Sequence, residues 1–217
     1  MKCLTSELTL ETPTPITGTP DKLRGSIASQ NINKSIYHQH TDEGLKYRYP
    51  LIHYHILDEK AVITGFLEGV DETKKLFQKL NYLQLGKKKH HITGKKLAIT
   101  EQEFGLTDRT HRYRFVSPWI ALNSRNYQKY IGFNGSSRLK FLEKILTGNI
   151  LSASKSLNYT VEDIIQTSLI YARQIPHKLK GTPILAFQGV FEVNFELPEL
   201  FGLGKSVSRG FGAIRRI

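Results

Sequence analysis

The order of apolar patterns along the first hundred residues limits the folds that this chain can adopt. Alternating apolar residues predict strands, and apolar residues spaced three and four apart predict helices. Asp21 and Asp71 stand where a carboxylate can cap each of the two predicted helices. The expected elements are, in order, a strand at 2–10, a helix at 22–35, strands at 51–57 and 62–67, a helix after residue 71 and a strand at 95–100. This order is that of a ferredoxin-like domain, which RNA-binding sheet domains share.

The second half of the chain loosely repeats this order. The expected elements are a strand at 112–122, helices at 137–146 and 161–173, and one long strand, or two strands, at 182–196. The second of these helices has the clearest pattern, because Thr160 can cap it and apolar residues from Val161 to Ala172 form one stripe. The sequence therefore predicts an α+β fold of two tandem ferredoxin-like (RRM-like) domains, 1–106 and 107–217, with a C-terminal glycine-rich loop.

The charge of the chain favours a nucleic-acid partner. Lysine and arginine outnumber aspartate and glutamate by 31 to 19, which gives a formal net charge of +12. No acidic residue occurs at 109–142, where basic and aromatic residues are interleaved, or at 81–100, which contains Lys87, Lys88 and Lys89. Basic groups contact phosphates, and exposed aromatic rings stack on unpaired bases. The alternative is that most of these aromatic residues belong to the core and that the lysine run is a solvated loop.

Several other classes of protein are excluded by the sequence. Cys3 is the only cysteine, so the chain has no disulfide framework and no cysteine-rich zinc site. The first ten residues include Lys2 and Glu7 and lack the apolar segment of a signal peptide. No apolar run approaches the roughly 20 residues of a membrane span. We therefore expect a cytoplasmic protein without a membrane partner.

Two Gly-apolar-Gly triplets, separated by five residues, stand near the C-terminus. Glycine permits positive φ and close backbone approach, and successive N–H groups in such a turn can bind an anion. The spacing does not match a nucleotide P-loop, and too few residues follow the last glycine for the helix of such a loop. The alternative is a glycine-bearing hairpin without a ligand. The residues predicted to bind RNA are Gly202, Gly204, Lys205, Ser206, Ser208, Arg209, Gly210 and Gly212.

Groups that can transfer protons cluster around the end of the first predicted helix, at Lys34, His38, His40 and Tyr47. Imidazole titrates near neutral pH, so two histidines could deprotonate a ribose 2′-OH and protonate a leaving 5′-oxygen. His38 and His40 point the same way only in extended backbone, which places them in a loop beyond the helix. An ordinary surface position is the alternative for each histidine.

Two further histidine pairs give weaker indications of a functional site. His53 and His55 fall on one face of a predicted strand, where we expect them to face RNA or to be exposed on the sheet. A metal site is disfavoured, because neither a cysteine nor a suitably spaced carboxylate could complete the ligand set. His90 and His91 stand in the lysine run and are expected to add phosphate contacts without a catalytic role.

These residues carry a family resemblance. The triplets Gly202-Leu203-Gly204 and Gly210-Phe211-Gly212 resemble the signature glycine loop of the RAMP superfamily. Together with two ferredoxin-like halves and a histidine site after the first helix, they make the chain most similar to the CRISPR repeat-cleaving endoribonucleases of that superfamily. The resemblance implies that His40 is the principal catalytic histidine, that His38 is its partner, and that Tyr47 and Lys34 support them.

The resemblance also implies the reaction and the partner. Family members cleave CRISPR precursor RNA within its repeats, without a metal or another cofactor, and leave a 2′,3′-cyclic phosphate and a 5′-hydroxyl. The expected partner is therefore CRISPR repeat RNA, as precursor and as processed guide RNA. The sequence leaves open which histidine is the base, whether the chain forms a homodimer and whether it stays in a CRISPR effector complex. The alternatives are a non-catalytic RAMP-type subunit that binds guide RNA in an interference complex, and a generic RNA-binding protein.

Overall fold

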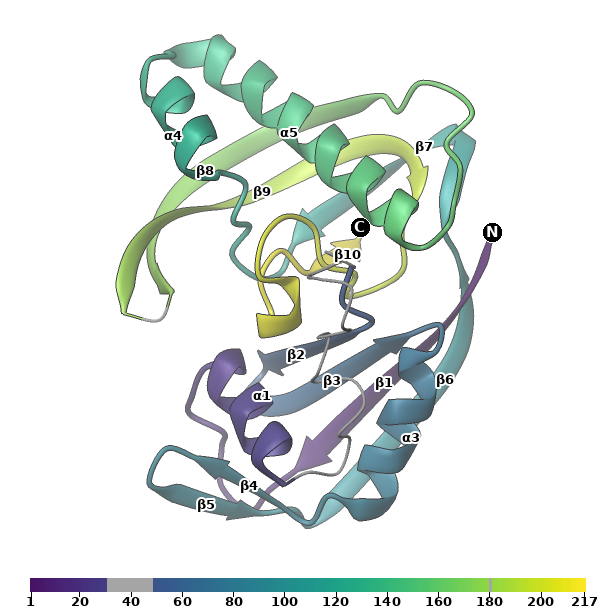
Figure 1. The fold of residues 1–217 in the computed structure, drawn as a ribbon, viewed down its shortest axis with the longest axis vertical. Helices are drawn as coiled ribbons and strands as arrows, with labels where there is room; N and C mark the ends of the chain where they lie inside the picture. Colours follow the sequence, from purple (N-terminus) through teal and green to yellow (C-terminus); the bar gives the residue numbers. More distant parts are fainter. Residues whose placement is uncertain (31–48, 180) are drawn as a thin grey trace, which may run out of the picture. The chain divides into compact units, whose positions relative to one another are not determined.

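A computed structural model describes residues 1–30, 49–179 and 181–217. The chain divides into two compact units (Figure 1). The N-terminal unit consists of residues 2–102 together with Ser208–Gly210, and the C-terminal unit consists of Met1, 103–207 and 211–217. No helix in the described part of the chain is both long and apolar enough to cross a bilayer.

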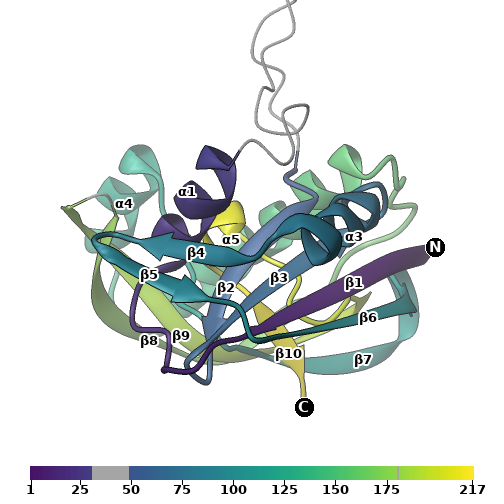
Figure 2. The same cartoon turned by 90° about the horizontal axis from the view of Figure 1, so that it is seen from below.

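The N-terminal unit is built on a four-stranded sheet in the order β2-β3-β1-β6. Its elements are β1 (Lys2–Glu11), α1 (Pro20–Ser29), β2 (Ile52–Leu57), β3 (Lys60–Phe66), α3 (Gly69–Lys79) and β6 (Gly94–Glu103), with a separate hairpin of β4 (Tyr82–Leu85) and β5 (Lys88–His91). Figure 2 shows α1 and α3 on the same side of this sheet. The chain order and the strand order are those of a ferredoxin-like domain, which confirms the fold predicted for this half.

The hairpin of β2 and β3 turns at Asp58 and Glu59, as the polar residues between the two predicted strands indicate. Both residues have positive φ, 48° and 59°, and Leu57 pairs directly with Lys60. A two-residue turn with positive φ at both positions matches the right-handed twist of the flanking strands. The turn therefore fixes the register in which β2 pairs with β3.

The C-terminal unit has a second four-stranded antiparallel sheet in the order β10-β7-β9-β8. Its elements are β7 (Gly105–Phe115), α4 (Ser124–Ile131), α5 (Gly135–Ser156), β8 (Thr167–Leu179), β9 (Thr182–Glu196) and β10 (Ile214–Arg216). A 3₁₀ turn (Val207–Arg209) begins in this unit and ends in Ser208–Gly210, which belong to the N-terminal unit. Figure 1 shows α5 lying across β8 and β9. The strand order repeats that of the N-terminal unit, but the glycine-rich segment at 197–213 occupies the place of the second helix.

Both units have a continuous apolar core. In the N-terminal unit, Leu8 and Leu10 of β1 pack with Leu23 of α1 and Leu76 of α3. In the C-terminal unit, the predicted strand at 182–196 forms with these same limits as β9, and its inner face is aromatic. The side chains of Phe187, Phe191, Val193 and Phe195 are fully buried there.

The helix predicted at 161–173 does not form. The strand β8 covers most of this segment and pairs with β9 from Thr167 opposite Val193 to Leu179 opposite Thr182. Ile164, a member of the predicted apolar stripe, is 73% exposed. Helix propensity is a weak preference, and from Thr167 onward an antiparallel pairing with β9 supplies backbone hydrogen bonds along one side of this segment instead. The prediction was wrong because the pairing partner lies outside the window in which the pattern was read.

Other boundaries also differ from the expected ones. The helix α4 and the β4–β5 hairpin were not predicted, and the lysine run expected as a loop lies on this hairpin. The helix expected at 137–146 extends over Gly135–Ser156. Thr19 and Glu68 are the N-cap residues of α1 and α3, so Asp21 and Asp71 lie within the first turns and are not caps. An acidic side chain there still interacts favourably with the helix dipole.

Candidate functional site

The glycine-rich segment folds back on itself and on the residues that follow β7. The N–H of Leu203 donates to the carbonyl oxygen of Gly212 over 2.9 Å, and the N–H of Gly212 donates to that of Pro118 over 2.9 Å. The N–H of Lys205 donates to the carbonyl oxygen of Ile120 over 3.0 Å. These three N–H groups therefore donate within the protein and are not available to a phosphate. The sequence had suggested instead that N–H groups of this loop could bind an anion.

Close packing explains two of the glycines. Gly204 has φ +92°, and a Cβ there would lie 2.7 Å from the carbonyl oxygen of Ile120 and 2.8 Å from Nε1 of Trp119. Gly212 has φ +67°, and a Cβ there would overlap the carbonyl oxygen of Leu203. A side chain at either position would be strained by the backbone conformation and would collide with fixed atoms. The fold of the segment itself thus requires these glycines.

Trp119 provides a rigid support beneath Gly204. Its indole is fully buried, stacks on Phe115 with 5.0 Å between ring centroids, and donates from Nε1 to the Asn149 side chain over 3.1 Å. Asn149 belongs to α5, so a hydrogen bond links the base of the loop to the long helix. The glycine segment is consequently anchored on the core of the C-terminal unit.

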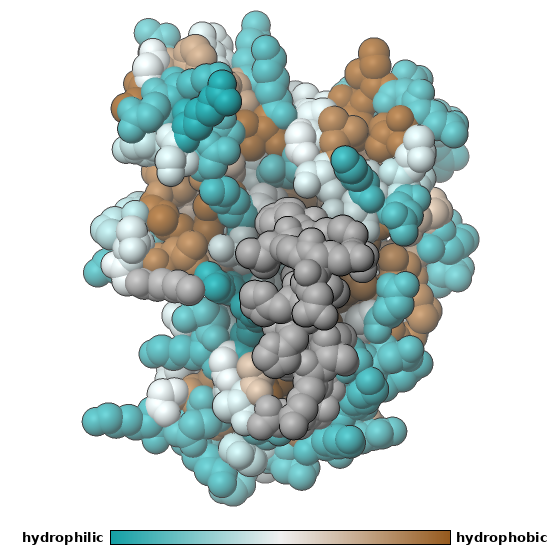
Figure 3. All heavy atoms as spheres, viewed as in Figure 1, coloured by the Kyte–Doolittle hydropathy of each residue, from teal (hydrophilic) through white to brown (hydrophobic). Residues whose placement is uncertain are grey.

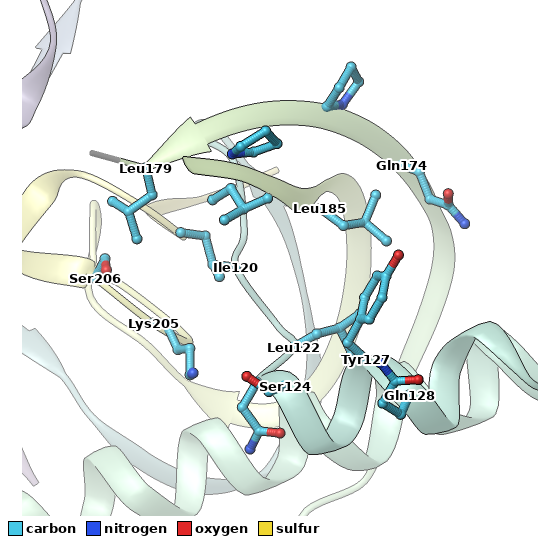
Figure 4. Close-up of a pocket in the computed structure, with 14 residues that line it drawn as sticks. Ile120, Leu122, Ser124, Tyr127, Gln128, Gln174, Leu179, Leu185, Lys205 and Ser206 are labelled. Carbon is cyan, nitrogen blue, oxygen red and sulfur yellow. The ribbon is translucent and has the colours of Figure 1, made fainter. Parts of the chain in front are cut away.

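The side chains predicted to bind RNA differ in their surroundings. Lys205 is exposed, and Lys205 and Ser206 line a pocket of about 1000 Å³ within the C-terminal unit. Figure 4 shows both residues at this pocket, together with Tyr127 and Gln128 of α4. Ser208 and Arg209 are half-buried and belong to the N-terminal unit. Of the four predicted glycines, Gly204 is half-buried, and those at 202, 210 and 212 are buried.

The four residues predicted to be catalytic, Lys34, His38, His40 and Tyr47, lie outside the described residues. The structure therefore adds nothing to their geometry. It does describe the other six histidines of the chain, and it changes the interpretation of several of them.

His53 and His55 do not face solvent. Their exposed fractions are 0% and 1%, while Ile52 and Tyr54, which point to the other face of β2, are also buried. Nε2 of His53 lies 2.9 Å from the carbonyl oxygen of Pro50, and Nε2 of His55 lies 3.2 Å from Oγ1 of Thr64. The expectation that both histidines are exposed on the sheet was wrong, because β2 is covered on both faces and alternation alone does not show this.

His90 is also unavailable for the phosphate contact that we expected. It pairs with Leu83 across the β4–β5 hairpin and is 3% exposed, and its burial lowers the pKa of its imidazole. A neutral buried ring does not attract a phosphate. His91, on the opposite face of the same strand, is exposed and keeps the predicted access to solvent.

A buried histidine on β7 gave no recognisable signal in the sequence. Nδ1 of His111 lies 2.6 Å from the guanidinium of Arg216, and its Nε2 lies 3.1 Å from Oε1 of Glu196. Arginine only donates, so Nδ1 is an acceptor and the ring is neutral. Burial lowers the pKa of His111, which also favours the neutral ring. Through its contacts with Arg216 and Glu196, the residue links β7 to β10 and β9.

Among the residues that Figure 3 colours by hydropathy, hydrophilic side chains predominate, with hydrophobic areas between them. Of the seven aromatic residues in the basic stretch at 109–142, four are buried: Tyr113, Phe115, Trp119 and Tyr130. Tyr127 and Phe133 are 42% and 38% exposed. Most of these aromatic residues thus belong to the core, and Tyr127 is the one that reaches the pocket.

Comparison with known proteins identifies the family. The family model described as the Cas6b N-terminal domain matches residues 1–103, and that of the Cas6b C-terminal domain matches residues 105–217. An uncharacterized protein of Methanocaldococcus jannaschii, MJ0978, is 44% identical over 116 residues, which cover 54% of this chain and 79% of the relative.

Two solved structures agree over the full length of both chains. A structure described as Cas6b superposes with a TM-score of 0.91 at 33% identity and covers 100% of each chain. A structure described as the CRISPR RNA processing endoribonuclease Cas6b has a TM-score of 0.79 at 28% identity, again over 100% of each chain. Since two family models together span nearly all of the sequence and a full-length Cas6b shares its fold, this chain belongs to the Cas6b family, which confirms its resemblance to the CRISPR repeat-cleaving endoribonucleases of the RAMP superfamily.

Proposed function

We propose that this chain is a CRISPR RNA-processing endoribonuclease that cuts precursor RNA within its repeats without a metal ion. The observation that carries the proposal is the full-length match to the two Cas6b domains and to a solved protein described as a CRISPR RNA processing endoribonuclease. The net charge of +12 suits an RNA substrate.

The reaction that we propose uses the substrate's own nucleophile. The 2′-OH on the 5′ side of the scissile phosphate attacks phosphorus, and its proton passes to a general base. The bond from phosphorus to the 5′-oxygen breaks, and a general acid protonates that oxygen. The products are a 2′,3′-cyclic phosphate and a 5′-hydroxyl, and no covalent enzyme intermediate forms.

His40 and His38 share the base and acid roles in this proposal, with Tyr47 and Lys34 as supporting groups. Lys34 or an arginine stabilises the charge that develops on the phosphorane. Few of the described histidines could serve as the general acid or base instead, because four of them are each at most 4% exposed: His53, His55, His90 and His111. Burial also lowers the pKa of His90 and of His111, so neither is poised to donate a proton near neutral pH.

In this proposal, exposed and half-exposed side chains of the glycine segment bind the RNA backbone. Lys205 and Arg209 supply charge, and Ser206 and Ser208 supply hydroxyl groups. Because the glycines at 204 and 212 are required by packing, we assign these two glycines to the shape of the loop rather than to direct contact with phosphate.

Single-turnover cleavage of the host's repeat RNA in EDTA tests the proposal. His40→Ala should lower the rate by about two or more orders of magnitude, the range that a general acid or base supplies. His38→Ala should cost less, and the double variant should be nearly inactive with a loss that need not be the product of the two. RNA affinity should change little, since a neutral imidazole adds no charge.

His177→Phe is the matched control, because His177 is a half-buried histidine on β8 without a catalytic role in this proposal. Its ring lies edge-on to Phe211, with 5.2 Å between centroids, and phenylalanine keeps an aromatic ring there while removing the imidazole. His53 is unsuitable as a control, because it is fully buried and its removal would leave a cavity in the core. RNA binding without cleavage by the wild type would indicate the non-catalytic guide-RNA-binding subunit. Wild-type rates in the double variant would remove His38 and His40 from the active site.

A further inference from the structure

The pocket at Lys205 and Ser206 has the size of a ligand site. Its volume of about 1000 Å³ lies at the upper end of the range of roughly 300–1000 Å³ that ligand sites occupy. It is an open pocket lined by the segment that leads into α4, by α4 itself, by the β8–β9 hairpin and by the glycine segment (Figure 4). All of these belong to the C-terminal unit, so the pocket is complete within one compact unit.

Apolar groups and hydrogen-bonding groups are combined in the lining. Tyr127 is 42% exposed, and Figure 4 shows its ring standing in the space between α4 and the hairpin. The Gln174 amide donates from Nε2 to the hydroxyl of Tyr130 over 2.7 Å, which fixes the side chain and leaves its carbonyl oxygen to accept a hydrogen bond. The main apolar side chains of the lining are Ile120, Leu122, Leu179, Ile184 and Leu185.

The electrostatics of the pocket select an anionic ligand. Its lining residues come from three stretches of sequence that contain no aspartate or glutamate, 109–142, 164–191 and 200–217. Among the described residues that line the pocket, Lys205 is the only charged one. An acidic ligand would meet a cation and no repelling carboxylate there.

A flat aromatic surface, amide groups and one cation together match the parts of a nucleotide. Bases stack on aromatic side chains, their edges exchange hydrogen bonds with amides, and a lysine pairs with phosphate. A base within a helical stem is stacked on both sides by its neighbours, so the ligand must be unpaired.

We propose that this pocket holds one unpaired nucleotide of the repeat RNA, with its base against Tyr127, its edge bonded to Gln174 and a phosphate beside Lys205. The identity of the RNA rests on the function proposed above. By holding one nucleotide at a defined place on the C-terminal unit, the pocket sets the register in which the repeat is bound.

An abasic scan of the repeat, combined with a tyrosine substitution, tests this assignment. The RNA carries a single 2′-deoxyribose at the scissile position so that binding is measured without cleavage. In the wild type, removal of one particular base should raise the Kd on the order of tenfold, as expected for a stacked base. Tyr127→Ala should raise the Kd for the intact repeat by a similar factor and should make that abasic position harmless, since the two changes remove the same contact.

Two further variants separate stacking from general damage. Tyr127→Phe keeps the aromatic surface and should bind like the wild type. Tyr171→Ala removes a tyrosine of similar exposure, 49%, that lies on β8 and does not line the pocket, and it should also bind like the wild type. Urea unfolding followed by Trp119 fluorescence shows whether each variant is folded.

The outcomes distinguish this proposal from the proposed function. If the wild type cleaves the repeat but no abasic position weakens binding, or if Tyr127→Ala binds like Tyr171→Ala, the nucleotide pocket is refuted and the endoribonuclease stands. If one abasic position weakens binding through Tyr127 but the wild type does not cleave, the pocket stands and the catalytic proposal fails. An equal loss at every abasic position would also overturn the pocket.

Discussion

Gly204→Ala should destabilise the C-terminal unit, because two separate costs arise at this position. A residue with a side chain held at φ +92° carries strain of roughly 1–3 kcal/mol. The new Cβ would also lie 2.7 Å from the carbonyl oxygen of Ile120 and 2.8 Å from Nε1 of Trp119, and such overpacking costs about 1–3 kcal/mol. Because relaxation relieves part of both, we expect a loss of about 3 kcal/mol, a large share of the roughly 5–15 kcal/mol that stabilises a folded protein.

The assay uses the single tryptophan of the chain, which is the residue that Gly204 touches. In urea, a loss of about 3 kcal/mol should lower the unfolding midpoint by about 1–3 M, since small proteins have m-values of roughly 1–3 kcal/mol per M. Gly181→Ala is the matched control, with φ +81° and no described heavy atom within 4 Å of its Cβ, so only the backbone strain of roughly 1–3 kcal/mol remains. Equal midpoints for the two variants would refute the argument that packing on Trp119 requires a glycine.

Three further predictions concern charge, pH and the buried histidines. Lys205→Ala and Arg209→Ala should each weaken RNA binding and reduce the salt dependence of the Kd by about 0.7 in log–log slope, and an unchanged slope would remove that residue from the RNA contact. His90→Leu should weaken the pH dependence of stability: the native pKa of His90 is lowered, so the unfolded chain takes up the proton first and stability falls as the pH drops below about 6.5. An unchanged difference in urea midpoint between pH 7 and pH 5 would contradict this. His53→Ala should lower the urea midpoint because its ring packs 5.0 Å from that of Phe66, whereas the exposed His91→Ala should not; equal midpoints would show that His53 is not a core residue.

Local patterns predicted the parts of the fold whose partners lie nearby in the sequence. The β2–β3 hairpin was predicted because its turn residues and both strands fall within one short window. The strand β9 was predicted within its observed limits because aromatic residues alternate along its length. The strand β8 was not, because its segment has an amphipathic helical spacing and only the pairing with β9 makes it extended.

The candidate site was also predicted only where local sequence patterns determine it. The spacing of the glycines indicated a tight turn, but the reason for Gly204 is the position of Trp119, which is 85 residues away in sequence (204 minus 119). The alternation of His53 and His55 placed them on one face of β2, but burial of that face depends on tertiary packing. Gln174 carried no signal at all, because the segment that contains it followed a predicted helix and its polar partner, Tyr130, lies on α4.

The central claim, that the substrate's 2′-OH is the nucleophile, is tested most directly by changing one atom of the RNA. Repeat RNA in which only the ribose 5′ of the scissile phosphate is replaced by deoxyribose should bind with nearly unchanged Kd and should not be cleaved, with or without EDTA. Cleavage of the deoxy-substituted RNA, or cleavage of the normal repeat only in the presence of a divalent ion, would contradict the mechanism.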